Sequence, residues 1–133
     1  MIVDSSAIIA ILKREPGWDV LSQALDTTPR SHMSAANYFE AGIVVDGSKN
    51  PVLSRQLDEL IERFSVHIEP VTAEQAVIAR QAYRDYGKGS GHAAGLNFGD
   101  CFSYALARVK REAILFKGDD FGHTDLRSAL DEG

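Results

Sequence analysis

Cysteine and long apolar runs are scarce in this 133-residue sequence, and each shortage excludes a class of protein. Cys101 is the single cysteine, so no internal disulfide can form, which fits a reducing compartment. No apolar run approaches the ~18 residues that a membrane-spanning helix needs. The first residues carry no basic segment, and Asp4 interrupts the early apolar stretch, so a signal peptide is not expected. These shortages predict a cytoplasmic protein with no membrane segment.

Basic residues are also fewer than acidic residues. The chain has 14 Lys and Arg against 19 Asp and Glu, a net charge of −5. Proteins that hold nucleic acid through their overall electrostatic field are usually basic. Any contact with nucleic acid must therefore be local, brief or aided by bound cations. The length predicts a single domain over residues 1–133, and a hydrophobic content of 44% is ordinary for a globular chain with one core.

Short strand-like segments alternate with longer helix-like segments along the chain. Candidate strands cover residues 1–4, 30–33, 66–69 and 113–116, and candidate helices cover 5–14, 16–25, 34–46, 51–64, 72–86 and a segment after Asn97. The expected helix starts are Ser5 or Ser6, Pro16, Ser34, Thr72 in a capping box with Gln75, and Asn97. Residues 85–100 hold five glycines and predict a long loop. The alternation favours an α/β domain with a mostly parallel sheet.

Acidic residues fall where the predicted parallel strands end. Asp4 closes the first strand, and Asp119 and Asp120 follow the last strand after a Lys-Gly turn. Asp100 lies in the first turn of the helix after the glycine-rich loop, and Glu40 lies in the apolar helix after the second strand. Open parallel sheets bind ligands beyond the carboxyl ends of their strands. The acids are therefore expected at one edge of the sheet, Glu40 included if its helix turns that face inward.

Each acid also has an ordinary explanation. Asp4 and Asp100 suit helix N-termini, the sequence GDDF suits a turn, and Glu40 suits a helix surface. As a cluster, however, they would repel one another unless a divalent cation lay among them. The chain has no CxxC or HExxH motif and its four histidines are scattered, which disfavours zinc. Carboxylate oxygens suit Mg²⁺ or Mn²⁺, ions that serve phosphodiester hydrolysis.

Four segments carry a resemblance to a known family: MIVDSSAIIAIL, SAANYFEAGIV, YGKGSGHAAGLNFGDCFSYALA and LFKGDDFGHTDL. They resemble PIN-domain ribonucleases, specifically the VapC toxins of bacterial VapBC toxin–antitoxin modules, over essentially the whole chain. The resemblance implies a three-layer α/β/α sandwich around a short, mostly parallel sheet. It also implies an endoribonuclease that depends on Mg²⁺, with Mn²⁺ as substitute, a cognate VapB-type antitoxin that inhibits it, and a homodimer.

The resemblance also assigns roles to individual residues. The family's acids fall on Asp4, Glu40, Asp100 and one of the adjacent pair Asp119 and Asp120, with Asp120 as the first choice. It implies that Asp4 and Asp100 bind the metal directly, and that Glu40 and Asp120 complete the site through water or a second metal. Ser6 matches a small hydroxyl residue beside the first acid, although capping of the first helix explains it equally well.

The residues that would hold RNA or the antitoxin are less specific. Lys88, His92 and Lys117 lie near the predicted edge and could position RNA, but each is also explained as ordinary solvated charge. Tyr86, Phe98 and Tyr104 could stack on bases, although core packing explains each of them better. Helices over residues 17–25 and 34–46 could form an antitoxin groove or be core. In the family, an antitoxin arginine often reaches the acidic pocket.

Three other function classes fit the sequence less well. A phosphoacceptor receiver domain would need an acidic pair after its first strand and an acceptor aspartate at mid-chain, where only Asp58 is available. A haloacid-dehalogenase phosphatase would need a second aspartate at the position of Ser6. A non-catalytic PIN-like protein that only binds RNA or a partner is the third alternative. The RNA target and the number of metal ions are open on sequence alone.

Overall fold

The computed structural model of the chain describes residues 1–132, so Gly133, the last residue of the predicted domain, lies outside the described residues. Its centre is a four-stranded sheet in the order β3-β2-β1-β4. The strands are β1 (Ile2–Val3), β2 (Ser31–Ser34), β3 (Val66–Glu69) and β4 (Ile114–Leu115). Neighbouring strands pair in parallel, so their carboxyl ends share one edge. The predicted parallel sheet is confirmed, and each strand lies in or within one residue of its predicted segment.

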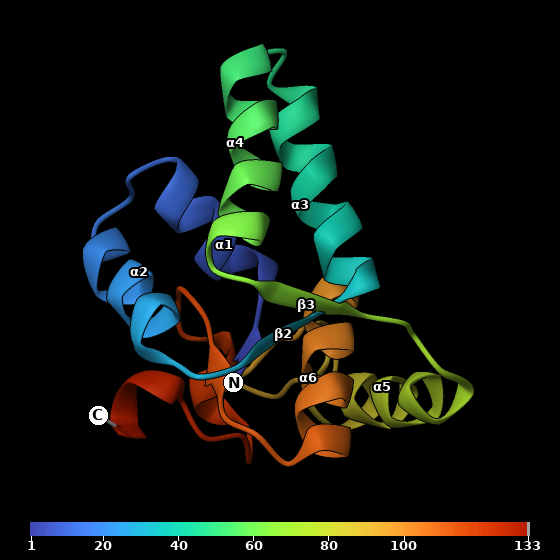
Figure 1. Cartoon of the computed structure of the whole chain (residues 1–133). Helices are drawn as coiled ribbons and strands as arrows, with labels where there is room; N and C mark the ends of the chain where they lie inside the picture. The colour runs from blue at the N-terminus through green and yellow to red at the C-terminus, as the bar shows by residue number, and fades with distance from the viewer. Residues whose placement is uncertain (133) are drawn as a thin grey trace.

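Helices cover the sheet on both faces. They are α1 (Ser5–Leu12), α2 (Trp18–Thr27), α3 (Ala35–Gly47), α4 (Pro51–Arg63), α5 (Ala73–Tyr86) and α6 (Phe98–Lys110), followed by the 3₁₀ helices η1 (Asp120–His123) and η2 (Ala129–Glu132). In Figure 1, β2 and β3 run between the α3–α4 pair above and α5 and α6 below. Among residues 1–132, no helix has the length and apolar character needed to cross a bilayer.

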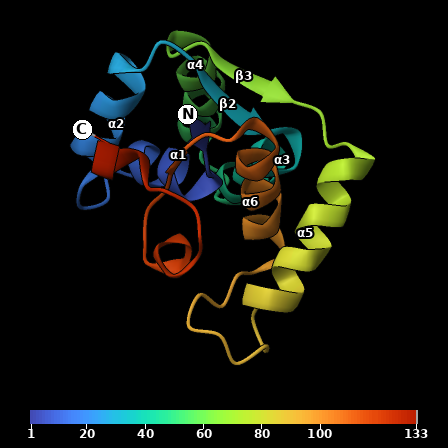
Figure 2. The same cartoon turned by 90° about the horizontal axis from the view of Figure 1, so that it is seen from below.

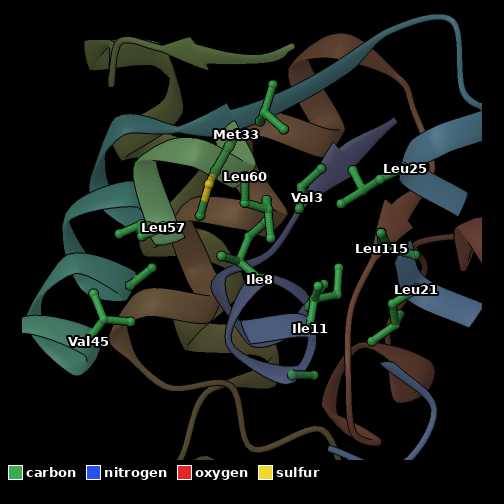
Figure 3. Close-up of a cluster of buried hydrophobic side chains, with 14 residues drawn as sticks. Val3, Ile8, Ile11, Leu21, Leu25, Met33, Val45, Leu57, Leu60 and Leu115 are labelled. Atoms are coloured by element: carbon green, nitrogen blue, oxygen red, sulfur yellow. The ribbon is translucent and has the colours of Figure 1, made fainter. Parts of the chain in front are cut away.

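Two hydrophobic cores fill the spaces between these layers. Successive residues of a strand point to opposite faces, so Val3 and Leu115 enter one core while Ile2 and Ile114 enter the other. Figure 3 shows the first core, in which side chains of α1 to α4 surround the sheet residues Val3, Met33 and Leu115. The second core lies between the sheet and α5 and α6. This arrangement confirms the predicted three-layer α/β/α sandwich.

Capping residues set the beginnings of the helices that flank the candidate site. The predicted caps Ser34, Thr72 and Asn97 each accept a hydrogen bond from a backbone N–H in the first turn of their helix. The reciprocal half of the Thr72 capping box is absent, because Gln75 Oε1 has no hydrogen-bond partner in the described structure. These caps place the start of α3 beside β2 and the start of α6 at the end of the glycine-rich loop.

One predicted helix start was correct and one was wrong. Helix α1 begins at Ser5 as predicted, and of the candidate caps Asp4, Ser5 and Ser6 the N-cap is Asp4, whose backbone is extended and whose side chain accepts from the Ser6 N–H. Helix α2 begins at Trp18 rather than Pro16, since Gly17 has a left-handed backbone with φ of 88° and interrupts the helix. The Asp4 cap matters for function, because it puts a capping carboxylate directly at the sheet edge.

The glycine-rich loop is shorter than predicted and is anchored at its base. It covers residues 87–97 rather than 85–100, because α5 continues to Tyr86 and α6 begins at Phe98. The Leu96 N–H donates to the Tyr86 carbonyl, and the Lys88 N–H donates to the Leu96 carbonyl, both at 2.8 Å. Leu96 is buried in the second core. Figure 2 shows the loop projecting from this base, and the hydrogen bonds at the base hold the end of α5 beside the residues that lead into α6.

Candidate active site

An acidic pocket of about 400 Å³ lies beyond the carboxyl ends of β1 and β4. We use "acidic pocket" for the space lined by Asp4, Ser5, Ser6, Ile9, Glu15, Glu40, Val44, Asn97, Asp100, Lys117, Asp120 and Phe121. The acids come from β1, α3, α6 and the segment after β4, together with Glu15 after α1. The structure therefore brings together four of the predicted acids, with Ser6 and Lys117. Asp119, Lys88 and His92 are not among the residues that line it.

Asp4 lies at the bottom of the acidic pocket and is only 1% exposed. Its Oδ2 accepts a hydrogen bond of 3.0 Å from the Ser6 N–H, and its Oδ1 accepts one from the Ser103 hydroxyl. Burial raises the pKa of the Asp4 carboxyl, and the charge of Glu40 raises it further, while the bonds from Ser103 and Ser6 oppose part of this shift. Capping α1 and lining the pocket are thus two roles of the same side chain.

Asp100 combines the same two roles at the start of α6. Its N–H donates to Asn97 Oδ1 at 2.8 Å, and its Oδ2 accepts from the Asn97 N–H at 3.0 Å, which completes a capping box. Burial raises the pKa of the Asp100 carboxyl to about 7, and the charges of Asp4, Asp120 and Glu40 add to the effect. The Asn97 hydrogen bond opposes it. Asp100 Oδ1 has no hydrogen-bond partner among residues 1–132, so it remains available to a ligand.

Glu40 reaches the acidic pocket from the middle of α3. Its Oε1 accepts hydrogen bonds from the Ser5 hydroxyl and, at 3.3 Å, from Asn37 Nδ2. The carboxylate lies against Gly99 so closely that a methyl group at position 99 would overlap it. Glycine is therefore required at position 99 for Glu40 to keep this position. The helix does turn its Glu40 face toward the sheet edge, which is the condition on which the prediction for Glu40 depended.

The segment after β4 separates the two adjacent candidates for the fourth acid. Both residues are exposed, but Asp120, which begins η1, lines the acidic pocket, whereas Asp119 lies outside its lining. The Lys117 N–H donates to Ser6 Oγ at 3.0 Å, which ties the end of β4 to α1. The Lys117 ammonium donates to the Pro16 carbonyl rather than to an acid. The first choice, Asp120, is thus the one that the geometry supports.

A second hollow adjoins the acidic pocket. We call it the α5–α6 groove; it measures about 520 Å³ and is lined by Ala76, Ala79, Arg80, Tyr83, Lys88, Asn97, Phe98, Cys101 and Phe102. Asn97 lines both hollows. Phe98 is 78% exposed, so the expectation of core packing was wrong for this residue, although it holds for Tyr104. Lys88 belongs to this groove and not to the acidic pocket.

His92 serves the loop rather than the acidic pocket. Its Nδ1 accepts a hydrogen bond of 3.0 Å from the Ala94 N–H, and its ring meets the Tyr86 ring edge-on, with 4.9 Å between the ring centroids.

Cys101, the single thiol, is buried, and burial together with the Asp100 charge raises its pKa to about 11. A thiol that stays protonated at neutral pH is a poor nucleophile.

Sequence reasoning missed three polar residues at the site. Glu15 lines the acidic pocket, and Asn37 and Ser103 lie fully buried behind it. Asn37 and Ser103 are 66 positions apart and contact each other only because α3 and α6 meet in the fold. Nothing in the sequence signals this contact. Glu15 could have been suspected as a pocket residue, since it directly follows the helix predicted over residues 5–14, which begins beside Asp4.

The ligand types of the acidic pocket suit a hard divalent cation. Its charged lining consists of carboxylates and one lysine, with no histidine or cysteine, which fits Mg²⁺ or Mn²⁺ and not zinc. As the described side chains stand, no three Asp, Glu, His or Cys residues are grouped closely enough to hold one ion. Protein-bound Mg²⁺ usually contacts one or two carboxylates and keeps several waters, so the lining satisfies the ordinary requirement for this ion.

Comparison with known proteins identifies the family. Residues 1–126 match the PIN domain. The chain is 57% identical to ribonuclease VapC28 of Mycobacterium tuberculosis over 131 residues, 98% of each protein. The chain belongs to the VapC group of PIN-domain proteins. This VapC chain also shares its fold with M. tuberculosis VapC20, described as a sarcin–ricin loop cleaving toxin; the TM-score is 0.73 at 16% identity, over 94% of this chain and 95% of the other. It shares the fold as well with a chain of a toxin–antitoxin complex from Klebsiella pneumoniae, with a TM-score of 0.69 at 17% identity, over 93% and 92% of the two chains.

Proposed function

We propose that this VapC protein is the ribonuclease toxin of a toxin–antitoxin module and hydrolyses phosphodiester bonds in RNA with the help of Mg²⁺ or Mn²⁺. The observation that carries the proposal is the convergence of Asp4, Glu40, Asp100 and Asp120 on one pocket from four separate segments. Its VapC relatives, named as ribonucleases, support the reaction class. Asp4 and Asp100 are the direct ligands in this proposal, because both line the pocket from helix starts and the charge of Asp4 acts on the Asp100 carboxyl.

The electrostatics of the pocket support a cation-dependent reaction. Asp4 and Asp100 both have raised pKa values, and part of each shift comes from neighbouring carboxylates. An RNA phosphate would meet the same repulsion. A bound divalent cation supplies charge neutralisation at the phosphate and activates water as a nucleophile. The carboxylates of this chain then need only to hold that cation and to accept a proton.

The neighbours of Glu40 and Asp120 suit these two acids to proton transfer. Glu40 is oriented by the Ser5 hydroxyl and by Asn37, so its carboxylate is held toward the pocket and can take a proton from the attacking water. Asp120 lies at the exposed rim and can exchange a proton with solvent. The water oxygen forms the new bond to phosphorus while the opposite oxygen leaves with one RNA fragment. No covalent intermediate with the protein is required.

The α5–α6 groove is the proposed contact for the RNA strand beside the scissile bond. It combines the exposed Phe98 ring with the cationic side chains of Arg80 and Lys88. Bases of single-stranded RNA stack on aromatic side chains, and such contacts are each worth about 1–3 kcal/mol. Asn97 lines both hollows, so an RNA strand that passes Asn97 would contact the groove and the acidic pocket.

The Phe98→Ala substitution is expected to raise KM for RNA about fivefold or more, with kcat changed far less, because a stacking contact of about 1 kcal/mol or more is lost while the acids are untouched. Steady-state kinetics on a short fluorescent RNA measures both constants. Val77→Ala is the matched control, since Val77 is also an exposed apolar residue but lies outside both hollows. Equal KM values for wild type and Phe98→Ala would remove the groove from the proposal.

An antitoxin would cover the surface beside the acidic pocket. On α3, Phe39 is 69% exposed and Ile43 is 57% exposed, and Val44 of the same helix lines the pocket. An apolar antitoxin segment on this face could place an arginine among the acids, where a guanidinium would pair with carboxylates. The toxin–antitoxin complex with the same fold supports this class of partner. Homodimerisation and a cytoplasmic location are part of the same proposal.

The test of the proposed function uses the purified chain, a panel of structured and single-stranded RNAs, and the product of the adjacent reading frame. We expect cleavage with Mg²⁺ or Mn²⁺, no cleavage in EDTA, restoration by added Mn²⁺, and inhibition by the co-purified partner. RNA binding without cleavage in either metal would instead support the non-catalytic alternative. Mapping the RNA ends identifies the target.

A further inference from the structure

Two fully buried polar side chains connect acids that belong to different parts of the fold. Ser103 of α6 and Asn37 of α3 are each 0% exposed, and neither lines the acidic pocket. The Ser103 hydroxyl lies within hydrogen-bond distance of Asp4 Oδ1 and, at 2.9 Å, of Asn37 Oδ1. Buried polar groups are costly unless they are bonded, so these contacts fix both side chains in place.

The connection continues from Asn37 to the other side of the pocket. Asn37 Nδ2 donates to Glu40 Oε1 at 3.3 Å and to the Gly99 carbonyl at 2.9 Å. A chain of contacts therefore runs from Asp4 through Ser103 and Asn37 to Glu40. Gly99, which the Glu40 carboxylate touches, precedes Asp100 directly, so the same contacts also bear on the start of α6.

We infer that Asn37 and Ser103 form a positioning pair that holds Asp4 and Glu40 at a fixed separation, so that the acidic pocket binds a divalent cation without first reordering its acids. The inference rests on the proposed function only in taking the pocket as a cation site. Neither residue reaches the pocket surface, so neither touches the cation or RNA. Both act through the carboxylates that they contact, in the way that outer residues orient metal ligands in other proteins.

The readout is the affinity for Mn²⁺, measured from the electron paramagnetic resonance signal of the free ion during titration of the full chain. Ser103→Ala and Asn37→Ala are each expected to weaken Mn²⁺ binding by about 10–100-fold. Because the two residues act as one unit, the double variant is expected to bind about as weakly as the weaker single variant. Ser103→Thr keeps the hydroxyl and is expected to stay close to wild-type affinity.

Ser31→Ala is the matched control, because Ser31 is a buried serine whose hydroxyl has no hydrogen-bond partner in the described part of the chain and lies outside the acidic pocket. Its Mn²⁺ affinity is expected to equal that of wild type. Thermal melts of each variant separate positioning from stability, and Asn37→Ala carries the test if Ser103→Ala does not fold. A lower melting temperature with unchanged Mn²⁺ affinity of the folded protein would overturn the inference, as would multiplying effects in the double variant.

The outcomes also separate this inference from the proposed function. Wild type that binds Mn²⁺ and cleaves RNA, with pair variants that bind Mn²⁺ equally well, would overturn the inference alone. Wild type that binds Mn²⁺ without cleaving RNA, with weakened pair variants, would support the inference and contradict the proposed reaction. Wild type that binds no Mn²⁺ would overturn both.

Discussion

The Asp4→Asn substitution is expected to reduce RNA cleavage by roughly a hundredfold or more while leaving the fold intact, because losing a direct ligand forfeits several kcal/mol of charge stabilisation. Asparagine caps helices as well as aspartate does, so α1 should keep its start. The substitution also removes a carboxyl whose pKa burial has raised. The melting temperature of the cation-free protein should therefore equal or exceed that of wild type. Cleavage assays and thermal melts on the same preparation check both parts.

The adjacent acids Asp119 and Asp120 supply a matched control for this prediction. Asp120→Asn should lower the cleavage rate, because Asp120 lines the acidic pocket, whereas Asp119→Asn makes the same chemical change outside it and should leave the rate unchanged. Asp100→Asn should resemble Asp4→Asn. Cleavage by Asp4→Asn at the wild-type rate would show that the acidic pocket does not carry the reaction.

Stability of the cation-free protein is expected to fall as the pH rises from about 4 to about 7. The Asp100 carboxyl has an ordinary pKa of 3.8 and a folded pKa of about 7, so the folded state binds its proton more tightly than the unfolded state does. A carboxyl with a raised pKa stabilises the fold while it is protonated, and that contribution is lost as the pH passes through the folded value. Asp4 acts in the same direction.

Added Mn²⁺ or Mg²⁺ should reverse this loss above about pH 7, where the acids are ionised, and should have little effect near pH 5, where protons compete with the cation. Melting temperatures measured across this range, with and without the cation, give both trends. The difference between wild type and Asp100→Asn isolates this carboxyl from every other group that titrates over the same range. A difference between wild type and Asp100→Asn that does not change with pH, or no rise in the melting temperature of wild type with Mn²⁺ at about pH 8, would contradict the account.

The sheet and most helices followed from local signals. Residues 66–69 alternate apolar and polar side chains and form β3 over that same range, and Ser34, Thr72 and Asn97 cap the helices that they were expected to cap. The start of α2 failed because Pro16 is a favourable first residue, but Gly17 takes a left-handed backbone that no helix continues. At this position, the preference of proline for a helix start was outweighed by the turn that connects α1 to α2.

The acidic pocket was predictable to the extent that sheet topology determines it. Parallel strands deliver their carboxyl ends to one edge, and that rule indicates that Asp4, Asp100 and the pair Asp119 and Asp120 lie near it, while the choice of Asp120 depended on the family resemblance. The buried pair could not be found in this way, because Asn37 and Ser103 are ordinary helix residues until α3 and α6 pack together. Phe98 was also misjudged: an aromatic residue in an apolar helix predicts burial, but Phe98 is exposed although Gly99 and Cys101 of the same turn are buried.

Diffraction from crystals soaked in Mn²⁺, recorded at an energy where manganese scatters anomalously, tests the central claim most directly. The account predicts an anomalous peak in the acidic pocket, in contact with Asp4 and Asp100 and absent from Asp4→Asn crystals prepared in the same way. A peak elsewhere on the molecule, or none in the pocket at saturating Mn²⁺ and a pH above 7, would contradict it.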